Sequence, residues 1–421
     1  MQRRHFLTSV AASAGAVAIS STGPGILRAA PSATRRRAGR TTPATNIEIR
    51  TSYPEIAPFG REVFERRIER ARSLMREAAA TVLVATSGAT NFEYLVGRNF
   101  GRSERLIALF VPVSGDPIIV APSFEAERVR RGAKVGTVIP WEEHESPYDI
   151  TTKALGTAAS SSVLLLEPKT EYWTAMRIAG AIPGAKLLDG SDVFERMRLV
   201  KRPEEIERMR RATVISEDAI AATLDQLEVG MRDRDIAAIV SSEHEKRGVQ
   251  GGALVQLGAQ SALPHGGTIG TALAEGMVVL IDGGCEFEGY ASDITRTRWF
   301  GDAPPQKFVE MYNLVYDAQT AAMEKVRPGV PCQEIDRAAR AVITNGGYGP
   351  YFTHRLGHGM GMEGHEPAYM VEGNTRPLEP GFMFSVEPGI YILNDYGVRI
   401  EDDYMCTETG GELLSRRPPK V

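Results

Sequence analysis

The sequence predicts an α+β protein with two domains. Its 421 residues are 43% hydrophobic and 24% charged, which is typical of a globular chain long enough for two domains. Short apolar segments alternate with helical or turn segments between residues 55 and 190, and this alternation indicates a small α/β domain. A helix begins at Pro203, with proline in its first turn and acids at its positive end. We therefore place the domains at residues 50–197 and 203–421.

Residues 1–20 have the features of an export signal. Arg3 and Arg4 precede Phe6-Leu7 and a weakly hydrophobic Ala/Gly/Ser stretch, which is the twin-arginine pattern. This stretch is too short and too polar for a stable membrane span, which needs about 20 apolar residues. Residues 1–46, which contain no acids, therefore read as a signal followed by a flexible linker. The pattern predicts a periplasmic or extracellular protein, or a membrane-tethered one if the signal stays uncleaved.

The first domain opens with an amphipathic helix over residues 61–80. Apolar Val63, Leu74 and Met75 fall on one face, and arginines that include Arg67 fall on the other. Four apolar segments with the length and composition of strands follow, and a helix or turn is expected over residues 123–131. The expected strands are 81–85, 106–113, 118–120 and 163–166.

Charge and cysteine content exclude two classes of protein. The net charge is −4, and residues 1–40 hold seven arginines and no acid, so the remainder carries −4 − 7 = −11. An acidic body argues against nucleic acid as a partner. Three cysteines are too few for a disulfide framework. Cys285 lies close to Asp282, but a soft thiolate suits hard carboxylate neighbours poorly, so we interpret it as a packed thiol.

Three acids in the last third of the chain follow apolar segments that predict buried strands. Asp282 follows M-V-V-L-I, Glu387 follows F-M-F-S-V and Glu401 follows V-R-I. Burying an unpaired carboxylate costs several kcal/mol, so the three acids need a common cation. With Asp293 in S-D-I-T-R-T and His358 in G-H-G-M-G, they form a ligand set suited to Mn, Co or Zn. Two such ions, roughly 3.5–4 Å apart, can acidify a shared water, so the set predicts metal-assisted hydrolysis.

These motifs, in this order, resemble the pita-bread metallopeptidases, the family of methionine aminopeptidase, aminopeptidase P and prolidase, with creatinase as a non-metal relative. The resemblance covers the chain from about Tyr53 onward and is sharpest between Pro264 and Asp402. It implies the pita-bread fold, in which two helix pairs with pseudo-twofold symmetry back a curved antiparallel sheet. It also implies a small creatinase-like α/β domain before the catalytic domain.

The resemblance further implies a role for each ligand. Asp282 would bind one of two divalent metal ions, and Asp293 and Glu401 would bridge both. His358 and Glu387 would complete the shell of the second ion. All five positions are filled in this chain, which disfavours a metal-free, creatinase-like protein.

Four of the seven histidines gather near these motifs, in P-H-G and in H-x3-H-x6-H. The second pattern resembles the proline-directed branch, aminopeptidase P and prolidase. The resemblance implies that His354 lines a pocket for the proline ring, that His365 bonds the tetrahedral intermediate, and that His265 lies near the scissile amide. Alternatively, these histidines only cap turns among the neighbouring glycines. Arg399, in G-V-R-I-E, is expected to brace the carboxylates as a bidentate partner.

The sequence thus predicts an exported dinuclear-metal peptidase that hydrolyses the Xaa-Pro bond of dipeptides or of peptide N-termini. Manganese is the expected metal, with cobalt or zinc as alternatives, and Glu387 is suited to take the proton of the attacking water. We expect a peptide substrate with proline second and a homodimer or higher homo-oligomer. The sequence leaves open a dipeptidase or an aminopeptidase, a less proline-selective aminopeptidase, and a metal-dependent lyase or other small-molecule hydrolase on the same fold. A binding module without catalysis would lack a ligand, and none is missing.

A faint internal repeat fits the pseudo-twofold expectation. G-M-R-D-R-D-I-A-A and G-V-P-C-Q-E-I-D-R each follow one predicted helix and start another. Three pairs of positions share one offset, 329 − 230 = 99: Gly230 and Gly329, Ile236 and Ile335, and Gly248 and Gly347.

Overall fold

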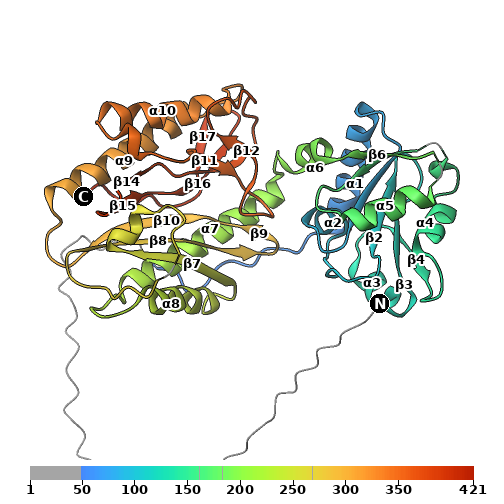
Figure 1. The fold of residues 1–421 in the computed structure, drawn as a ribbon, viewed down its shortest axis with the longest axis horizontal. Coiled ribbons are helices and arrows are strands. Elements are labelled where there is room, and N and C mark those ends of the chain that lie inside the picture. Colours follow the sequence, from blue (N-terminus) through green and yellow to red (C-terminus); the bar gives the residue numbers. More distant parts are fainter. Residues whose placement is uncertain (1–48, 161, 183, 268) are drawn as a thin grey trace, which may run out of the picture. The chain divides into compact units, whose positions relative to one another are not determined.

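The computed structural model describes residues 49–421 except 161, 183 and 268, and Figure 1 shows their helices and strands. The export signal and linker predicted for residues 1–46 lie outside the described residues. In the part of the chain that is described, no helix is both long enough and apolar enough to cross a membrane. The helices and strands up to Arg198 make up an N-terminal α/β region, and those from Pro203 onward make up a C-terminal α+β region.

The N-terminal region is built on a six-stranded sheet in the order β4-β3-β2-β1-β5-β6. Strands β1, β5 and β6 run parallel to one another, and β2 is antiparallel to both of its neighbours. The strands are β1 (Val82–Thr86), β2 (Ala108–Pro112), β3 (Ile118–Pro122), β4 (Thr137–Trp141), β5 (Val163–Leu166) and β6 (Lys186–Asp189). The helices are α1 (Arg61–Glu77), α2 (Thr90–Val96), α3 (Ser123–Gly132), α4 (Pro147–Leu155), α5 (Tyr172–Ala181) and α6 (Ser191–Arg198), with a short 3-10 helix η1 (Gly156–Ala159).

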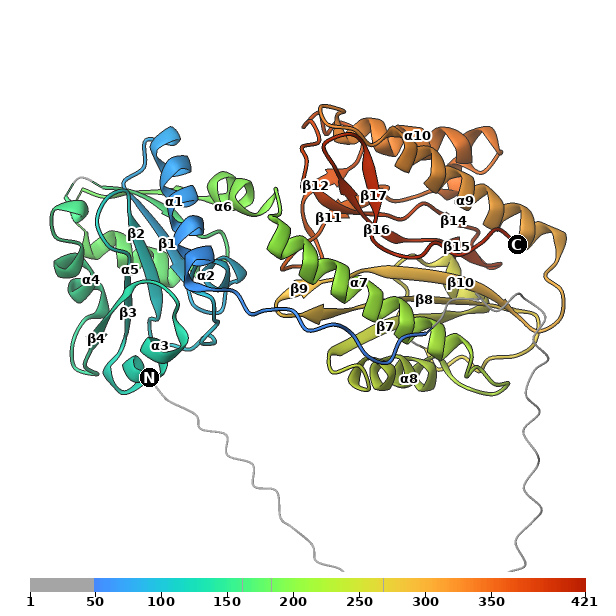
Figure 2. The ribbon, with the colours of Figure 1, turned by 180° about the vertical axis from the view of Figure 1, so that it is seen from behind.

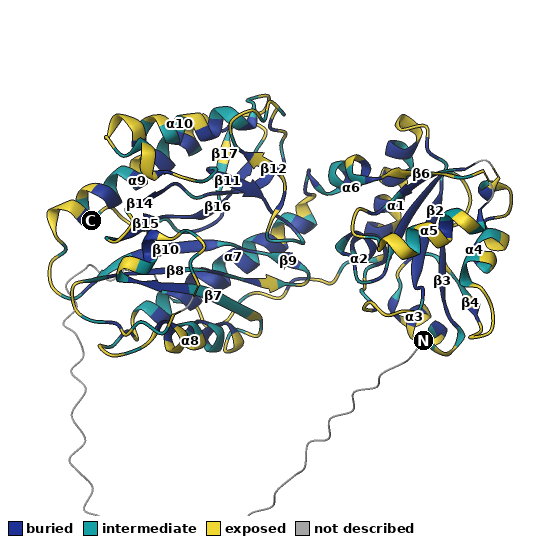
Figure 3. Cartoon of the chain, in the orientation of Figure 1, coloured by how far each residue is buried: buried dark blue, intermediate teal, exposed yellow. Residues whose placement is uncertain are grey.

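Both faces of this sheet are buried. Successive side chains of a strand point to opposite faces, so Leu83 packs in one core while Val82 and Val84 pack in the other. This double burial explains why the strands read as continuous apolar segments rather than as an alternating pattern. Figure 3 shows the central strands buried and the outer faces of the helices exposed, whereas most residues of the edge strands β4 and β6 are exposed or half-buried.

Arg67 departs from the prediction for the first helix. The arginine was expected on the solvent face, but its side chain is buried. Its guanidinium donates to the carbonyl of Tyr94 at 2.8 Å and to Glu205 at 3.1 Å, and it stacks over the Tyr94 ring at 3.9 Å. A buried arginine is stable only when its donors and its charge are matched in this way, and those partners are 27 and 138 residues away in the chain. Helical periodicity itself puts Arg67 on the apolar face, four residues after Val63 and seven before Leu74, so the predicted division of the two faces was wrong at this residue.

The C-terminal region consists of two helix pairs on antiparallel sheets. The helices are α7 (Pro203–Leu224), α8 (Asp233–Glu245), α9 (Gln306–Lys325) and α10 (Cys332–Asn345), with 3-10 helices η2 (Gly258–Ala262) and η3 (Gly349–Tyr351). The first set of strands is β7 (Gln250–Leu257), β8 (Met277–Phe287), β9 (Tyr290–Ala291) and β10 (Ile294–Phe300). The second set is β11 (Gly357–Gly359), β12 (Glu366–Met370), β13 (Met383–Val386), β14 (Gly389–Tyr391), β15 (Gly397–Arg399), β16 (Asp402–Cys406) and β17 (Gly411–Leu413).

The internal repeat corresponds to a structural repeat. In both views α7 and α8 lie on one side of the strands and α9 and α10 on the other (Figure 1, Figure 2). Gly230 and Gly329 each lie between the two helices of a pair, with φ of 89° and 83°. Ile236 and Ile335 are fully buried at matching positions of α8 and α10. This arrangement is the predicted pita-bread fold.

Strand β8 is longer than predicted. The predicted strand ended at Ile281, before Asp282, and this end is wrong because β8 continues to Phe287. A Cβ atom at Gly283 would lie 2.3 Å from the carbonyl oxygen of Gly252, and one at Gly284 would lie 1.9 Å from that of Ser292. The glycines therefore let neighbouring backbones approach, and they mark close packing rather than the end of a strand.

Candidate metal centre

All the predicted site residues line one pocket of about 470 Å³ in the C-terminal region. This volume is ordinary for a site that takes a small ligand, for which pockets of about 300–1,000 Å³ are typical. The predicted site residues are spread along the sequence from His265 to Glu401, and the pocket brings them together. Its predicted members are His265, Asp282, Asp293, His354, His358, His365, Glu387, Arg399 and Glu401.

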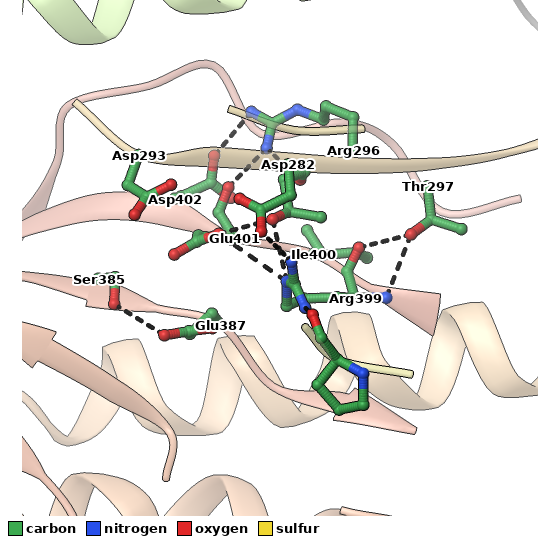
Figure 4. A network of polar contacts seen from close by, with 12 residues as sticks. Asp282, Asp293, Arg296, Thr297, Ser385, Glu387, Arg399, Ile400, Glu401 and Asp402 are labelled. Carbon is green, nitrogen blue, oxygen red and sulfur yellow. Dashed lines mark hydrogen bonds and ion pairs between the residues drawn. The ribbon is translucent and has the colours of Figure 1, made fainter. Parts of the chain in front are cut away.

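Backbone pairing around Thr295 brings three of the carboxylates together. Thr295 of β10 lies opposite Asp282 of β8, and on its other side it forms a β-bridge with Glu401. Residues directly opposite in antiparallel strands point to the same face, so Asp282 and Glu401 flank Thr295 on one face. Asp293 precedes Thr295 by two residues and points to that face as well. The three acids therefore converge, and Glu387 joins them (Figure 4).

The second strand set supplies the remaining ligands. His358 is the central residue of β11, and Glu387 directly follows β13, which pairs with both β11 and β16. The hydroxyl of Ser385 accepts from the His358 backbone N–H at 3.1 Å and donates to Glu387 at 3.3 Å. The Ser385 hydroxyl thus holds both candidate ligands in place through these two hydrogen bonds.

The candidate ligand atoms form overlapping groups. Asp282, Asp293 and Glu401 each offer an oxygen within 4.8 Å of the others, and His358, Glu387 and Glu401 form a second group of the same size. A third group joins Asp293 and His358 to His365. Glu401, Asp293 and His358 are therefore each shared between two groups, and the two carboxylates among them can each offer two oxygens.

Burial and mutual repulsion make this cluster unstable as free anions. Burial first, and then neighbouring carboxylates that include Asp282 and Glu387, raise the pKa of both Asp293 and Glu401 well above their ordinary values. Burial raises the pKa of Glu387 to about 7. A cation among the four acids would restore their charged form, as a divalent ion does for its carboxylate ligands.

His358 is oriented as a ligand. Its Nδ1 lies 3.1 Å from the carbonyl oxygen of Gly359, which can only accept, so Nδ1 carries the proton. The free Nε2 faces Asp293 at 3.7 Å and Glu387 at 3.5 Å. Burial lowers the pKa of His358 to about 3, so the ring is neutral at physiological pH. A neutral imidazole whose second nitrogen bonds a carbonyl is the usual arrangement of a metal-bound histidine.

Arg399 braces the cluster by a different geometry from the predicted bidentate fork. One terminal nitrogen donates to Asp282, the other donates to Tyr391 at 3.1 Å, and Nε donates to Thr295 at 3.0 Å. Nε also lies 3.9 Å from Glu401. The guanidinium therefore donates to several partners instead of to one carboxylate, because Thr295 lies between the two acids that Arg399 faces.

His354 has both ring nitrogens engaged. Nδ1 donates to the carbonyl of Arg355 at 2.6 Å, which leaves Nε2 as an acceptor. The hydroxyl of Tyr391 donates to Nε2 at 2.8 Å while it accepts from Arg399. Burial lowers the pKa of His354 to about 4, so this ring is a neutral, fixed wall of the pocket rather than a proton carrier.

His365 is more exposed than His354 and His358, which line the same pocket. Its ring stacks on His358 with 3.8 Å between centroids. An amino group of Arg355 donates to its Nδ1 at 3.4 Å, which places the proton of the neutral ring on Nε2. Burial, and then the charge of Arg355, lower the pKa of His365. The ring can therefore donate one hydrogen bond into the pocket.

Sequence reasoning missed three residues that hold the ligands. The Thr295 hydroxyl donates to Glu401 at 2.6 Å. Asp403, which is fully buried, accepts from the backbone N–H of Asp293 at 3.2 Å. Tyr391 links His354 to Arg399 as described. Their positions beside ligand motifs are a weak signal, since only strand register shows which of them point inward.

The residues present fit a metal. Four carboxylates and one neutral imidazole are a donor set for hard or borderline divalent ions. Burial and neighbouring carboxylates raise the pKa values of Asp293, Glu387 and Glu401, and a bound cation would supply the positive charge that these acids need. Cys285 takes no part, because its thiol is buried and directed to the carbonyl of Ala212 at 3.4 Å. The prediction of a packed thiol agrees with this placement.

Fold and site together define a metal-dependent peptidase with a pita-bread catalytic region. The chain belongs to metallopeptidase family M24, whose model matches residues 207–408, and residues 67–200 match the creatinase/prolidase N-terminal domain. Enzymes of this family depend on metal.

The chain aligns with similar proteins over nearly their whole length. The chain is 35% identical to the probable dipeptidase PepE of Mycobacterium tuberculosis over 370 residues, which is 86% of this chain and 97% of that one. It is 33% identical to the putative dipeptidase YkvY of Bacillus subtilis, over 84% of this chain and 98% of that one.

Solved structures agree with these relatives. The dipeptidase PepE of Mycobacterium ulcerans superposes with a TM-score of 0.81 at 32% identity, covering 87% of this chain and 99% of that one. The prolidase of Thermococcus sibiricus superposes with a TM-score of 0.78 at 29% identity, covering 85% and 98%. The chain is therefore an M24 peptidase whose relatives include dipeptidases and prolidases.

Proposed function

We propose that this enzyme is an exported dipeptidase that hydrolyses the Xaa-Pro bond with two divalent metal ions, manganese first among them. The observation that carries the proposal is the single pocket in which four carboxylates and His358 lie beside the fixed ring of His354. The dipeptidase names of similar proteins favour dipeptides over longer peptides as substrates. The metal ions, when bound, would acidify a water and polarise the scissile carbonyl.

The overlapping groups of ligand atoms support two ions rather than one. One ion would bind Asp282, Asp293 and Glu401, and the other would bind His358, Glu387 and Glu401, with Asp293 reaching both. Glu401 and Asp293 are thus the proposed bridges. Four carboxylates also supply enough negative charge for two divalent cations.

Glu387 is the proposed general base. Its carboxylate lies among the candidate ligand atoms, where it could take the proton of the attacking water and return it. The Ser385 hydroxyl holds one of its oxygens, which leaves the other for the attacking water. Glu387 would then pass this proton to the leaving amine.

The histidines would divide substrate recognition from oxyanion binding. The neutral ring of His354 offers a flat wall for a proline ring, since neither of its nitrogens is free to bond the substrate. His365 can donate from Nε2 to the oxygen of the tetrahedral intermediate. His265 lines the same pocket and would face the scissile amide. A tertiary Xaa-Pro amide has no N–H for ordinary recognition, so such a pocket is needed.

Substrate choice is tested with purified, manganese-loaded enzyme. We expect Ala-Pro to be hydrolysed much faster than Ala-Ala, and faster than the tripeptide Ala-Pro-Ala. Equal rates on Ala-Pro and Ala-Ala would contradict the proline preference. A preference for the tripeptide would instead indicate an aminopeptidase.

Metal content is tested by elemental analysis of variants. Glu401→Ala and Asp293→Ala should lose both ions and turnover, because each change removes a bridge and leaves the other acids unpaired. Asp225→Ala, a change to an acid outside the pocket, is the matched control and should keep two ions. Two ions bound to either bridge variant would contradict the assignment.

Two further parts of the proposal concern the cell. Export rests on the Arg3-Arg4 motif, which lies outside the described residues. A homodimer or higher homo-oligomer remains our expectation, which light scattering of the purified enzyme would test.

A further inference from the structure

A second cavity, of about 160 Å³, lies at the carboxyl ends of three parallel strands of the N-terminal sheet. Asn91 lies in the first turn of α2 after β1, Glu167 directly follows β5, and Ser191 opens α6 after β6. In open α/β sheets ligands bind at this edge, beyond the carboxyl ends of the strands. The cavity is separate from the metal centre and shares no lining residue with it.

Two residues that line this cavity each have a buried polar atom without a partner. Among the described residues, neither Oε2 of Glu167 nor Nε of Arg198 has a hydrogen-bond partner. Glu167 is 1% exposed, and the side chain of Arg198 is 10% exposed. The amide of Asn91 bonds both residues, through Nδ2 to Glu167 at 3.1 Å and through Oδ1 to Arg198 at 3.0 Å. The Asn91 amide therefore lies between a carboxylate with a free acceptor atom, Glu167, and a guanidinium with a free donor atom, Arg198.

The other carboxylates of the cavity already have cations. Glu366 pairs with Lys201 at 3.1 Å and with Arg198, Glu363 pairs with Lys169, and Glu195 pairs with Arg376 at 2.9 Å. With Glu167, these are four acids against four bases, so the site is neutral as a whole while its Glu167 oxygen stays unmatched. A lone cation would satisfy Glu167 but face an unpaired guanidinium N–H, and a lone anion would do the reverse.

We propose that this cavity binds a free α-amino acid in its zwitterionic form, with the ammonium at Glu167 and the carboxylate at Arg198. Such a ligand carries both charges side by side and no net charge, which matches the neutral but polarised site. A cavity near 150 Å³ holds a molecule of about the size of benzene, so a small amino acid fits. Free amino acids are the products of a dipeptidase. The cavity proposal therefore rests on the proposed function only for the source of its ligand.

The test is calorimetric titration of the manganese-loaded enzyme with L-alanine and L-proline, beside ethylamine and propionate, each of which lacks one charge. We expect the amino acids to bind and the two analogues to bind at least about tenfold more weakly, since each analogue leaves one buried charged group unsatisfied. Glu167→Gln should lose this binding to the same extent. Glu195→Gln, a matched change to a carboxylate of the same cavity that already has a partner, should keep it.

The enzyme assay separates this site from the metal centre. Glu167→Gln should hydrolyse Ala-Pro with the kcat/KM of the wild type, since Glu167 touches no residue of the metal pocket. Loss of proline preference in the wild type would overturn the proposed function and leave the cavity proposal standing. Unchanged amino-acid binding in Glu167→Gln, ethylamine binding as tight as that of alanine, or a wild-type cavity that holds only water in a crystal soaked with alanine would each overturn the cavity proposal.

Discussion

Hydrogen bonds assign opposite roles to two histidines that the sequence places eleven residues apart (365 − 354). His354 uses both ring nitrogens inside the protein, while His365 keeps one N–H for the pocket. Because both are neutral, neither role depends on a charge that a pH change would remove near neutrality. Removing each side chain should therefore change a different kinetic parameter of the enzyme.

Alanine substitutions test this division. His354→Ala should raise KM for Ala-Pro at unchanged metal content, with a loss in kcat/KM of roughly 1–3 kcal/mol, the value of one pocket contact. His365→Ala should lower kcat by about 2.7–4 kcal/mol, since its bond forms to charge that develops in the transition state. Steady-state kinetics with Ala-Pro separate the two cases. A fall in kcat alone for His354→Ala would remove it from the substrate wall.

Single residues also show the limit of sequence reasoning. Ligand chemistry, and the apolar segments before three of the acids, pointed to the candidate metal ligands, whereas the resemblance to a known family pointed to His265, His354 and His365. The residues that hold them were missed, because Tyr391, Thr295 and Asp403 act through strand register, which the sequence does not contain. Arg67 was misplaced although its spacing from Val63 puts it on the apolar face of the helix, and only its partners, which are remote in the chain, could not be predicted.

At the scale of elements, helices and strands were predicted best where a local signal exists. The proline and acids at Pro203 mark the start of α7 correctly. The 99-residue repeat was faint in sequence but corresponds to two helix pairs whose linking glycines share a left-handed conformation. By contrast β4, α4, α5 and β6 were not predicted, and β8 was cut short at its glycines. Their boundaries depend on tertiary pairing rather than on composition.

The paired glycines give a test of the repeat. Gly230→Ala and Gly329→Ala should each destabilise the enzyme by about 1–2 kcal/mol, because both have positive φ and no atom within 4 Å of an added Cβ, so that strain alone decides. Gly180→Ala is the control: its site is equally open but lies in α5, where alanine is expected to be neutral or slightly stabilising. Chemical denaturation midpoints measure all three. Unequal losses for Gly230 and Gly329 would argue against equivalent positions.

At the scale of the whole molecule, the carboxylate cluster ties stability to pH. Asp293, Glu401 and Glu387 have folded pKa values above their unfolded ones, so their stabilising contribution is complete at low pH and is lost as pH rises through the folded values. His354 and His358 act in the opposite sense, but only below about pH 6.5, the ordinary histidine pKa. Above that pH the carboxyl groups dominate the balance.

Metal-free enzyme should therefore lose thermal stability between about pH 6.5 and 8. Tm is measured after chelation at both pH values, with manganese-loaded enzyme as the control. The loaded enzyme should show a smaller decrease, because bound cations hold the acids in their charged form in the folded state. A Tm of the metal-free enzyme that is constant or rises over this range would contradict the picture of a repelling, buried cluster.

Export is also a property of the whole chain. Replacing Arg3 and Arg4 by lysine should leave a folded, active enzyme in the cytoplasm, because the metal pocket lies more than 250 residues further along, at His265 and beyond. Cell fractionation with an Ala-Pro assay measures this. Undiminished periplasmic activity of the double variant would rule out the twin-arginine route.

The bridge at Thr295 joins two strand sets that each carry only part of the ligand shell. Asp282 and Asp293 come with the first set, and His358, Glu387 and Glu401 come with the second. A chain in which one half has folded and the other has not can therefore present only a fragment of the binding site, too weak to retain a divalent ion. Metal binding would thus mark the completion of folding, because only a molecule whose two strand sets have paired in register would present the whole candidate site. A route that exports only folded proteins would deliver such molecules already loaded.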